Sequence, residues 1–88
     1  MESRKINDIL ICMCEKHINI DFNKKSDLKT QHFFSRKINA SASEVAVLLL
    51  EIEKVFQVSI DNEFILAGEF SSFDNLYHYL LEKCRLSN

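Results

Sequence analysis

The sequence predicts an all-α fold, a small bundle of four helices with one long loop between the first and the second helix. Apolar residues recur at helical spacing in three separate segments. The 88 residues include one Gly and no Pro, whereas a sandwich of many short strands needs such residues at its tight turns. A chain of this length has room for one core, so we expect residues 1–88 to form a single domain.

The first helix is predicted from Ser3 to about Lys16, because apolar residues follow each other three and four positions apart along one face. This periodicity disappears between Ile18 and about Ala40, where Asn, Asp, Ser and Lys dominate. Such a connection is long for a compact domain. We therefore expect a loop that its own apolar residues pin to the core, namely Phe33, Phe34 and Ile38.

The second helix is predicted from Ser41 to about Val58. Ser41 and Glu44 have the spacing of a capping box, in which the hydroxyl and the carboxylate satisfy main-chain N–H groups at the helix start. An apolar stripe follows and marks the face expected to be buried. Its members are Val45, Leu48, Leu49, Ile52 and Phe56.

Two further helices are predicted in the rest of the chain. A short one follows Asp61 as its cap, with Ile60 and Ile65 as a hydrophobic staple and Gly68 in a left-handed position after its end. The last helix begins at Ser71 or Ser72 and ends near Lys83 or Arg85. Its apolar stripe consists of Phe73, Leu76, Tyr77 and Leu80.

The outer face of the second helix is the candidate functional surface. At 100° per residue, the side opposite the core carries Ser43, Val47, Leu50, Glu51 and Lys54. Two of these residues, Val47 and Leu50, are apolar where contact with water is expected. Single exposed apolar residues are normal, but a pair of them also fits a docking patch for a partner protein or the interface of a homodimer.

Other classes of function find little support in the sequence. The net charge of −2 gives no reason to expect nucleic acid, and no apolar run reaches the length of a membrane span. Cys12, Cys14 and Cys84 do not form a zinc pattern, so we expect reduced thiols in a cytoplasmic protein. The three histidines, His17, His32 and His78, lack metal-binding spacing. We therefore expect no metal site and no enzyme activity.

The segment from Phe34 to Ile60, FSRKINASASEVAVLLLEIEKVFQVSI, resembles the acyl carrier proteins. Phe34 and Ile38 fit the end of that family's long loop, and Asn39 stands at its glycine. Phe56 and Ile60 fit the end of its second helix without a gap, and the terminal FDNLYHYLLEK is similar to its last helix. The resemblance implies a single acyl-carrier-like domain over residues 1–88, with the four-helix acyl-carrier-protein-like bundle as its fold.

The same register departs from the family at its signature residue. Ala42 falls where the family carries the serine that is esterified to 4′-phosphopantetheine, and a methyl group cannot form that ester. The chain also resembles acyl-carrier-related proteins of peptide-maturation gene clusters that lack this serine. This implies a protein without cofactor that docks to a partner enzyme of a peptide-maturation or acyl pathway. The alternative is a genuine acyl or peptidyl carrier with 4′-phosphopantetheine on Ser43 or Ser41.

Overall fold

The computed structural model describes residues 2–86, and every regular element in this range is helical. The all-α prediction is confirmed, with four α-helices joined by loops that carry two short 3₁₀ helices. The α-helices are α1 (Ser3–Ile18), α2 (Ala42–Phe56), α3 (Asn62–Leu66) and α4 (Phe73–Leu86). The 3₁₀ helices are η1 (Ser26–Thr30) in the long loop and η2 (Glu69–Ser71) before α4.

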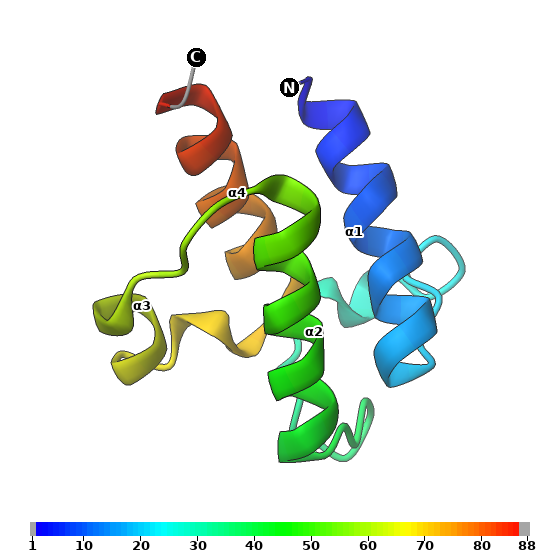
Figure 1. Cartoon of the computed structure of the whole chain (residues 1–88). Helices are drawn as coiled ribbons and strands as arrows, with labels where there is room; N and C mark the ends of the chain where they lie inside the picture. The colour runs from blue at the N-terminus through cyan, green and yellow to red at the C-terminus, as the bar shows by residue number, and fades with distance from the viewer. Residues whose placement is uncertain (1, 87–88) are drawn as a thin grey trace.

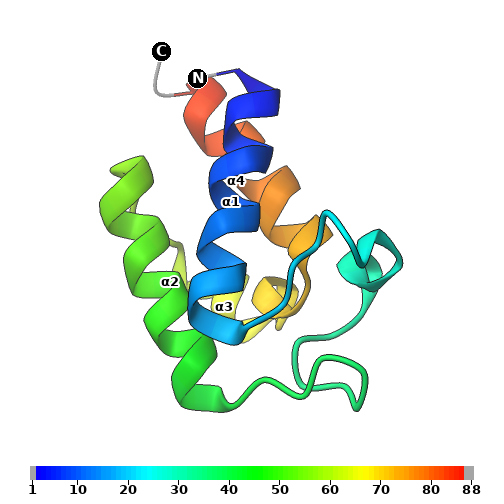
Figure 2. The same ribbon diagram turned by 90° about the vertical axis from the view of Figure 1, so that its right-hand side faces the viewer.

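The three long helices form the bundle. α1 runs antiparallel to both α2 and α4, so that the start of α1 and the end of α4 lie at the same end of the molecule (Figures 1 and 2). The closest packing is between α1 and α2, and α1 also packs against α4. α3 lies beside the bundle, in the connection from α2 to α4 (Figure 1). The buried stripes of the helices meet in one core, whose fully enclosed residues include Ile6, Leu10, Leu48, Ile52, Leu76 and Leu80.

The ends of α1 and α2 are set by residues in the left-handed conformation. Asn19 (φ 59°) follows α1 and Gln57 (φ 54°) follows α2, and each donates its N–H back into the last helical turn. As a result α1 is two residues longer than predicted, and α2 ends at Phe56 rather than near Val58. Asparagine tolerates this conformation better than most residues, which agrees with a helix end at Asn19.

The predicted capping box at the start of α2 is confirmed. The Ser41 hydroxyl accepts a hydrogen bond from the Glu44 N–H (3.1 Å), and the Glu44 carboxylate accepts one from the Ser41 N–H (2.8 Å). The hydrogen bond from the Ser41 N–H and, after it, the nearby Ser41 hydroxyl hold the pKa of the Glu44 carboxyl below its usual range. The box fixes the residue at which α2 begins.

The long loop from Asn19 to Ser41 leaves the end of α1, runs beside the lower part of the bundle and returns to the start of α2 (Figure 2). Its apolar side chains anchor it to the core. Phe22 and Phe33 are completely buried, and the Phe22 ring packs at 4.8 Å from the ring of Phe73 in α4. Phe34, expected to pin the loop as well, is instead 44% exposed. Asn39, at the position of the family's glycine in the resemblance, has a positive φ of 55°.

The connection from α2 to α4 confirms one predicted feature and corrects another. Gly68 follows the end of α3 with a φ of 74°, as expected for a left-handed glycine. Asp61 is the N-cap residue of α3 by position, but its side chain makes no capping hydrogen bond. The carboxylate turns instead to Tyr79 and Lys83 in α4. At the start of α4, the Ser72 hydroxyl accepts from the Asn75 N–H (3.2 Å) and caps that helix.

Candidate functional site

An apolar groove of about 470 Å³ lies between α2 and the segment that contains α3 and η2. We call it the α2–α3 groove. On α2 its lining residues recur three and four positions apart, so that they form one stripe along the helix. The lining consists of Phe34, Ala42, Val45, Ala46, Leu49, Leu50, Glu53, Ile60, Ile65 and Phe70.

Three of the residues that line this groove expose large apolar side chains to solvent. Leu50 on α2 is 58% exposed, Ile65 on α3 38% and Phe34 on the long loop 44%. These three residues come from separate parts of the sequence and meet around one cavity. A contiguous apolar surface of this kind marks an interaction site more often than scattered exposed residues do.

Only part of the predicted outer face of α2 belongs to the groove. Leu50 lines the groove, whereas Val47 is 46% exposed and is not part of its lining. Glu51 and Lys54 also lie outside the lining and contact each other at 4.0 Å between the Glu51 Oε1 and Lys54 Nζ atoms. Ser43 is exposed at the start of the helix. Of the five predicted residues, Leu50 alone lines the groove, and the apolar surface continues from it into the groove.

The start of α2 places the candidate attachment residues side by side. Ala42 is the first residue of the helix, is exposed, and contributes to the groove lining. The Ser41 hydroxyl serves the capping box, and its oxygen lies 3.4 Å from the hydroxyl oxygen of Ser43. One of the two candidate hydroxyls, that of Ser41, is thus already engaged in holding the helix start.

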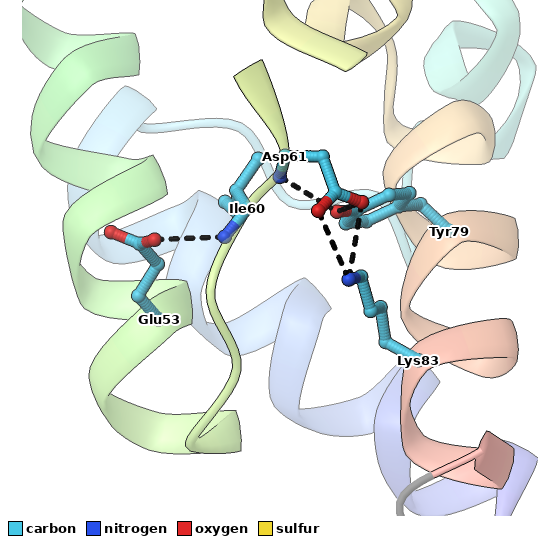
Figure 3. A network of polar contacts seen from close by, with 5 residues as sticks. All are labelled: Glu53, Ile60, Asp61, Tyr79 and Lys83. Atoms are coloured by element: carbon cyan, nitrogen blue, oxygen red, sulfur yellow. Dashed lines mark hydrogen bonds and ion pairs between the residues drawn. The ribbon is translucent and has the colours of Figure 1, made fainter. Parts of the chain in front are cut away.

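A polar network fixes the connection between α2 and α3, as Figure 3 shows. The Glu53 carboxylate accepts a hydrogen bond from the Ile60 N–H (2.8 Å). The Tyr79 hydroxyl accepts from the Asp61 N–H (2.9 Å) and donates to the Asp61 carboxylate (2.8 Å). Lys83 Nζ lies 3.1 Å from the Asp61 Oδ2 atom. We call the contacts of Asp61 with Tyr79 and Lys83 the Asp61 clip.

The Asp61 clip also positions α3 against the bundle. The ring of Phe64 in α3 stacks on the ring of Tyr79, with 3.9 Å between their centroids. The hydrogen bond from Tyr79 and, after it, the contact with Lys83 hold the pKa of Asp61 below its usual range. The bond with Asp61 raises the pKa of Lys83. The side of the groove that carries Ile65 therefore owes its position to α4.

We predict that Tyr79→Phe loosens α3 and raises the pKa of Asp61 toward its ordinary value. Because the folded-state pKa lies below the unfolded one, ionised Asp61 stabilises the fold above the unfolded pKa, about 3.9. This contribution is lost as the pH falls through the folded pKa. Hydrogen exchange and a carboxyl NMR titration measure the two effects. Faster exchange confined to residues 60–67 is expected, and unchanged exchange there would show that stacking alone holds α3.

Polar features outside the groove include a cavity and the cysteines. A cavity of about 420 Å³ at the start of α4 is lined by Thr30, His32, Ser71, Ser72, Asp74, Asn75 and His78. Within the described part of the chain, no group of three or more His, Cys, Asp or Glu residues is placed to hold a metal ion. Burial raises the pKa of the Cys14 thiol to about 12, and Cys12 is exposed.

Within residues 2–86, no helix has both the length and the apolar character that crossing a bilayer requires.

Sequence reasoning identified one groove residue, Leu50, as a partner-binding residue and missed the rest of that lining. Phe34, Ile60, Ile65 and Phe70 lie in the long loop, the α2–α3 connection, α3 and η2, and no single periodicity connects all four. Their approach depends on the path of the long loop and of the α2–α4 connection.

In comparisons with known proteins, no family model, curated protein sequence or solved structure matches this chain.

Proposed function

We propose that this protein is a non-enzymatic, acyl-carrier-related protein that acts by docking to a partner enzyme through the α2–α3 groove. The observation that carries this proposal is the exposure of Leu50, Phe34 and Ile65 around one apolar cavity. Removing such side chains from water is the main favourable term in protein association. The resemblance to carrier-related proteins supports a partner from a peptide-maturation or acyl pathway.

The chemistry of the groove supports docking in preference to catalysis. Glu53 is the one ionisable residue among the lining side chains, and one of its carboxylate oxygens already accepts the Ile60 N–H. General acid–base or nucleophilic catalysis needs a second group within hydrogen-bond reach of the first. The lining supplies no such second group, so its chemistry is that of a contact surface.

A pair of matched variants tests this proposal. Leu50→Glu places a charge in the groove, and Val47→Glu makes the same change on the same helix outside it. In a pull-down, enzymes encoded beside the gene are tagged and immobilised. They are expected to retain the wild-type protein and the Val47→Glu variant but not the Leu50→Glu variant. A loss of at least tenfold in affinity is expected, since about 1.4 kcal/mol separates each factor of ten and burying an unpaired charge costs more than that.

Circular dichroism and sedimentation are the controls for this experiment. All three proteins should show the same helical spectrum, because both positions are exposed. Equal retention of the two variants would refute docking through the groove, and loss with Val47→Glu alone would move the interface to the outer face of α2. Self-association that Leu50→Glu abolishes would identify the groove as a homodimer interface instead.

A further inference from the structure

We propose that the polar cavity of about 420 Å³ at the start of α4 binds a small zwitterion of the α-amino acid class. We call this site the α4 cavity. It shares no lining residue with the α2–α3 groove, so it is a second site that goes beyond the proposed docking function. Three features support the assignment: a buried hydroxyl without a partner, donors on both walls, and charges of both signs.

The α4 cavity lies where the long loop meets the start of α4. η1 packs against α4 (Figure 2), and the Phe33 N–H donates to the Ser71 carbonyl (2.6 Å). Thr30 and His32 form one wall, and residues between Ser71 and His78 form the other. The two walls are therefore held together by a main-chain hydrogen bond as well as by packing. The volume lies within the range of small-molecule sites, about 300–1,000 Å³.

A buried hydroxyl in the lining of the α4 cavity has no hydrogen-bond partner. Ser71 is 9% exposed, and within residues 2–86 its hydroxyl makes no hydrogen bond. The neighbouring Ser72 is equally buried, but its hydroxyl accepts the Asn75 N–H (3.2 Å). Leaving a buried polar group unsatisfied costs free energy, so such groups are uncommon in proteins. A ligand in the cavity can supply the partner that the Ser71 hydroxyl lacks.

The first turn of α4 adds main-chain donors. The N–H groups of Asn75 and Leu76 are bonded to Ser72. Those of Phe73 and Asp74 have no acceptor in the part of the chain that the structure describes. Free N–H groups at the positive end of a helix dipole attract an anionic group. Together with the buried hydroxyl of Ser71, they favour a carboxylate at this end of the cavity.

His32 supplies a further donor from the opposite wall. Its Nδ1 atom accepts the Phe34 N–H (3.1 Å), so the neutral ring carries its proton on Nε2. The Nε2–H group is then the part of the ring that can bond to a ligand. Because donors come from both the loop and the helix start, a carboxylate between the walls could accept from both of them.

The charges around the α4 cavity have both signs. Lys29 Nζ lies 5.1 Å from the centroid of the Phe73 ring and adds to the positive end of α4. Asp74 places a carboxylate in the lining, and Glu69 and Glu82 line an adjoining cavity. A simple anion would meet these carboxylates, and a simple amine would leave the donors without an acceptor. A ligand with an ammonium and a carboxylate on one carbon complements both.

Four small probes test the inference. Alanine carries both charges, propionate lacks its ammonium, ethylamine lacks its carboxylate, and glycerol is neutral. Each is titrated into isotope-labelled protein up to about 50 mM, a range suited to ligands this small, while NMR follows the amide shifts of residues 30–32 and 71–78. Alanine is expected to bind about tenfold more tightly than each of the others, because each lacks charge-assisted hydrogen bonds that alanine makes.

Asp74→Asn separates an effect of charge from an effect on structure. The variant should bind alanine about threefold more weakly and propionate about threefold more tightly, since the carboxylate attracts the ammonium and repels the anion. Local loss of structure would instead weaken both probes, and that result would contradict the assigned role. Asp8→Asn removes a carboxylate from an exposed position of α1 and should change neither affinity.

Ser71→Ala tests the buried hydroxyl. Its removal should weaken alanine and propionate alike, about fivefold. The free energy of unfolding should change little, because this hydroxyl makes no hydrogen bond within residues 2–86. Ser26→Ala removes an exposed hydroxyl from η1 and should leave binding unchanged. Wild-type affinity for alanine in Ser71→Ala would remove the hydroxyl from the site and overturn the inference.

The probe series also has outcomes that would overturn the inference. Propionate binding as tightly as alanine would identify a simple anion site. Ethylamine or glycerol doing so would identify an amine or polyol site instead. Unchanged shifts at residues 30–32 and 71–78 with alanine up to about 50 mM would exclude a zwitterion as the ligand. None of these outcomes would affect docking through the α2–α3 groove, since the two linings are separate.

Discussion

Phe33→Ala is expected to destabilise the fold by about 3–5 kcal/mol, the range measured when a large buried side chain is removed from a core. Phe33 is completely buried, its N–H donates to the Ser71 carbonyl (2.6 Å), and its carbonyl accepts from the Ala40 N–H (2.9 Å). The main-chain hydrogen bond to Ser71 ties the long loop to the segment that precedes α4, and the buried ring holds this part of the loop in the core. A domain of 88 residues has a total stability of roughly 4–13 kcal/mol, so this one change removes much of it.

The neighbouring residue provides a matched control. Phe34→Ala removes the same side chain from a position that is 44% exposed, and we expect a free energy of unfolding within about 1 kcal/mol of the wild type. Urea titrations followed by circular dichroism measure both variants. If Phe34→Ala proved as destabilising as Phe33→Ala, the division of this pair into a core anchor and a groove wall would be wrong.

Ala42→Ser is expected to convert a chain that accepts no phosphopantetheine arm into one that accepts it. Ala42 is exposed at the first position of α2, directly after the N-cap residue Ser41. Serine is tolerated at a helix start, because its hydroxyl can hydrogen-bond there without competing with the helix interior. The substitution therefore supplies the missing hydroxyl at the family's attachment position and should leave the fold unchanged.

Incubation with a phosphopantetheinyl transferase and coenzyme A, followed by intact mass and peptide mapping, measures this gain. Ala46→Ser is the matched control, because it adds the same hydroxyl one turn later along the same groove. One added arm on Ala42→Ser and none on Ala46→Ser is the expected result. Arms on both variants, or on neither, would refute the register that the resemblance places on this sequence.

Local patterns in the sequence predict the helices well. The capping box, the left-handed Gly68 and the buried stripe of α2 depend on residues within a few positions of each other. The structure confirms them, except that Leu49 of the stripe is half-buried and lines the groove. The role of Asp61 could not be predicted in this way. The sequence suggested that its carboxylate would cap the start of α3. In the structure the carboxylate instead contacts Tyr79 and Lys83, which are distant in the sequence.

The candidate site shows the same limit of sequence reasoning. Helical spacing separates Leu50 from the core correctly, but it groups Leu50 with Val47, although only Leu50 lines the groove. The adjacent residues Phe33 and Phe34 have identical side chains and opposite environments. Both differences depend on where the long loop and α3 lie against α2, and these positions are set by contacts between residues far apart in the sequence.

We propose that this helical bundle acts by docking, without a covalently attached arm. The most direct measurement is the intact mass of the unmodified wild-type chain after incubation with several phosphopantetheinyl transferases and coenzyme A. We predict an unchanged mass, because Ala42 has no hydroxyl and Ser41 is engaged in the capping box. A single added arm, mapped to Ser43 or Ser41, would contradict the claim and identify a genuine carrier protein.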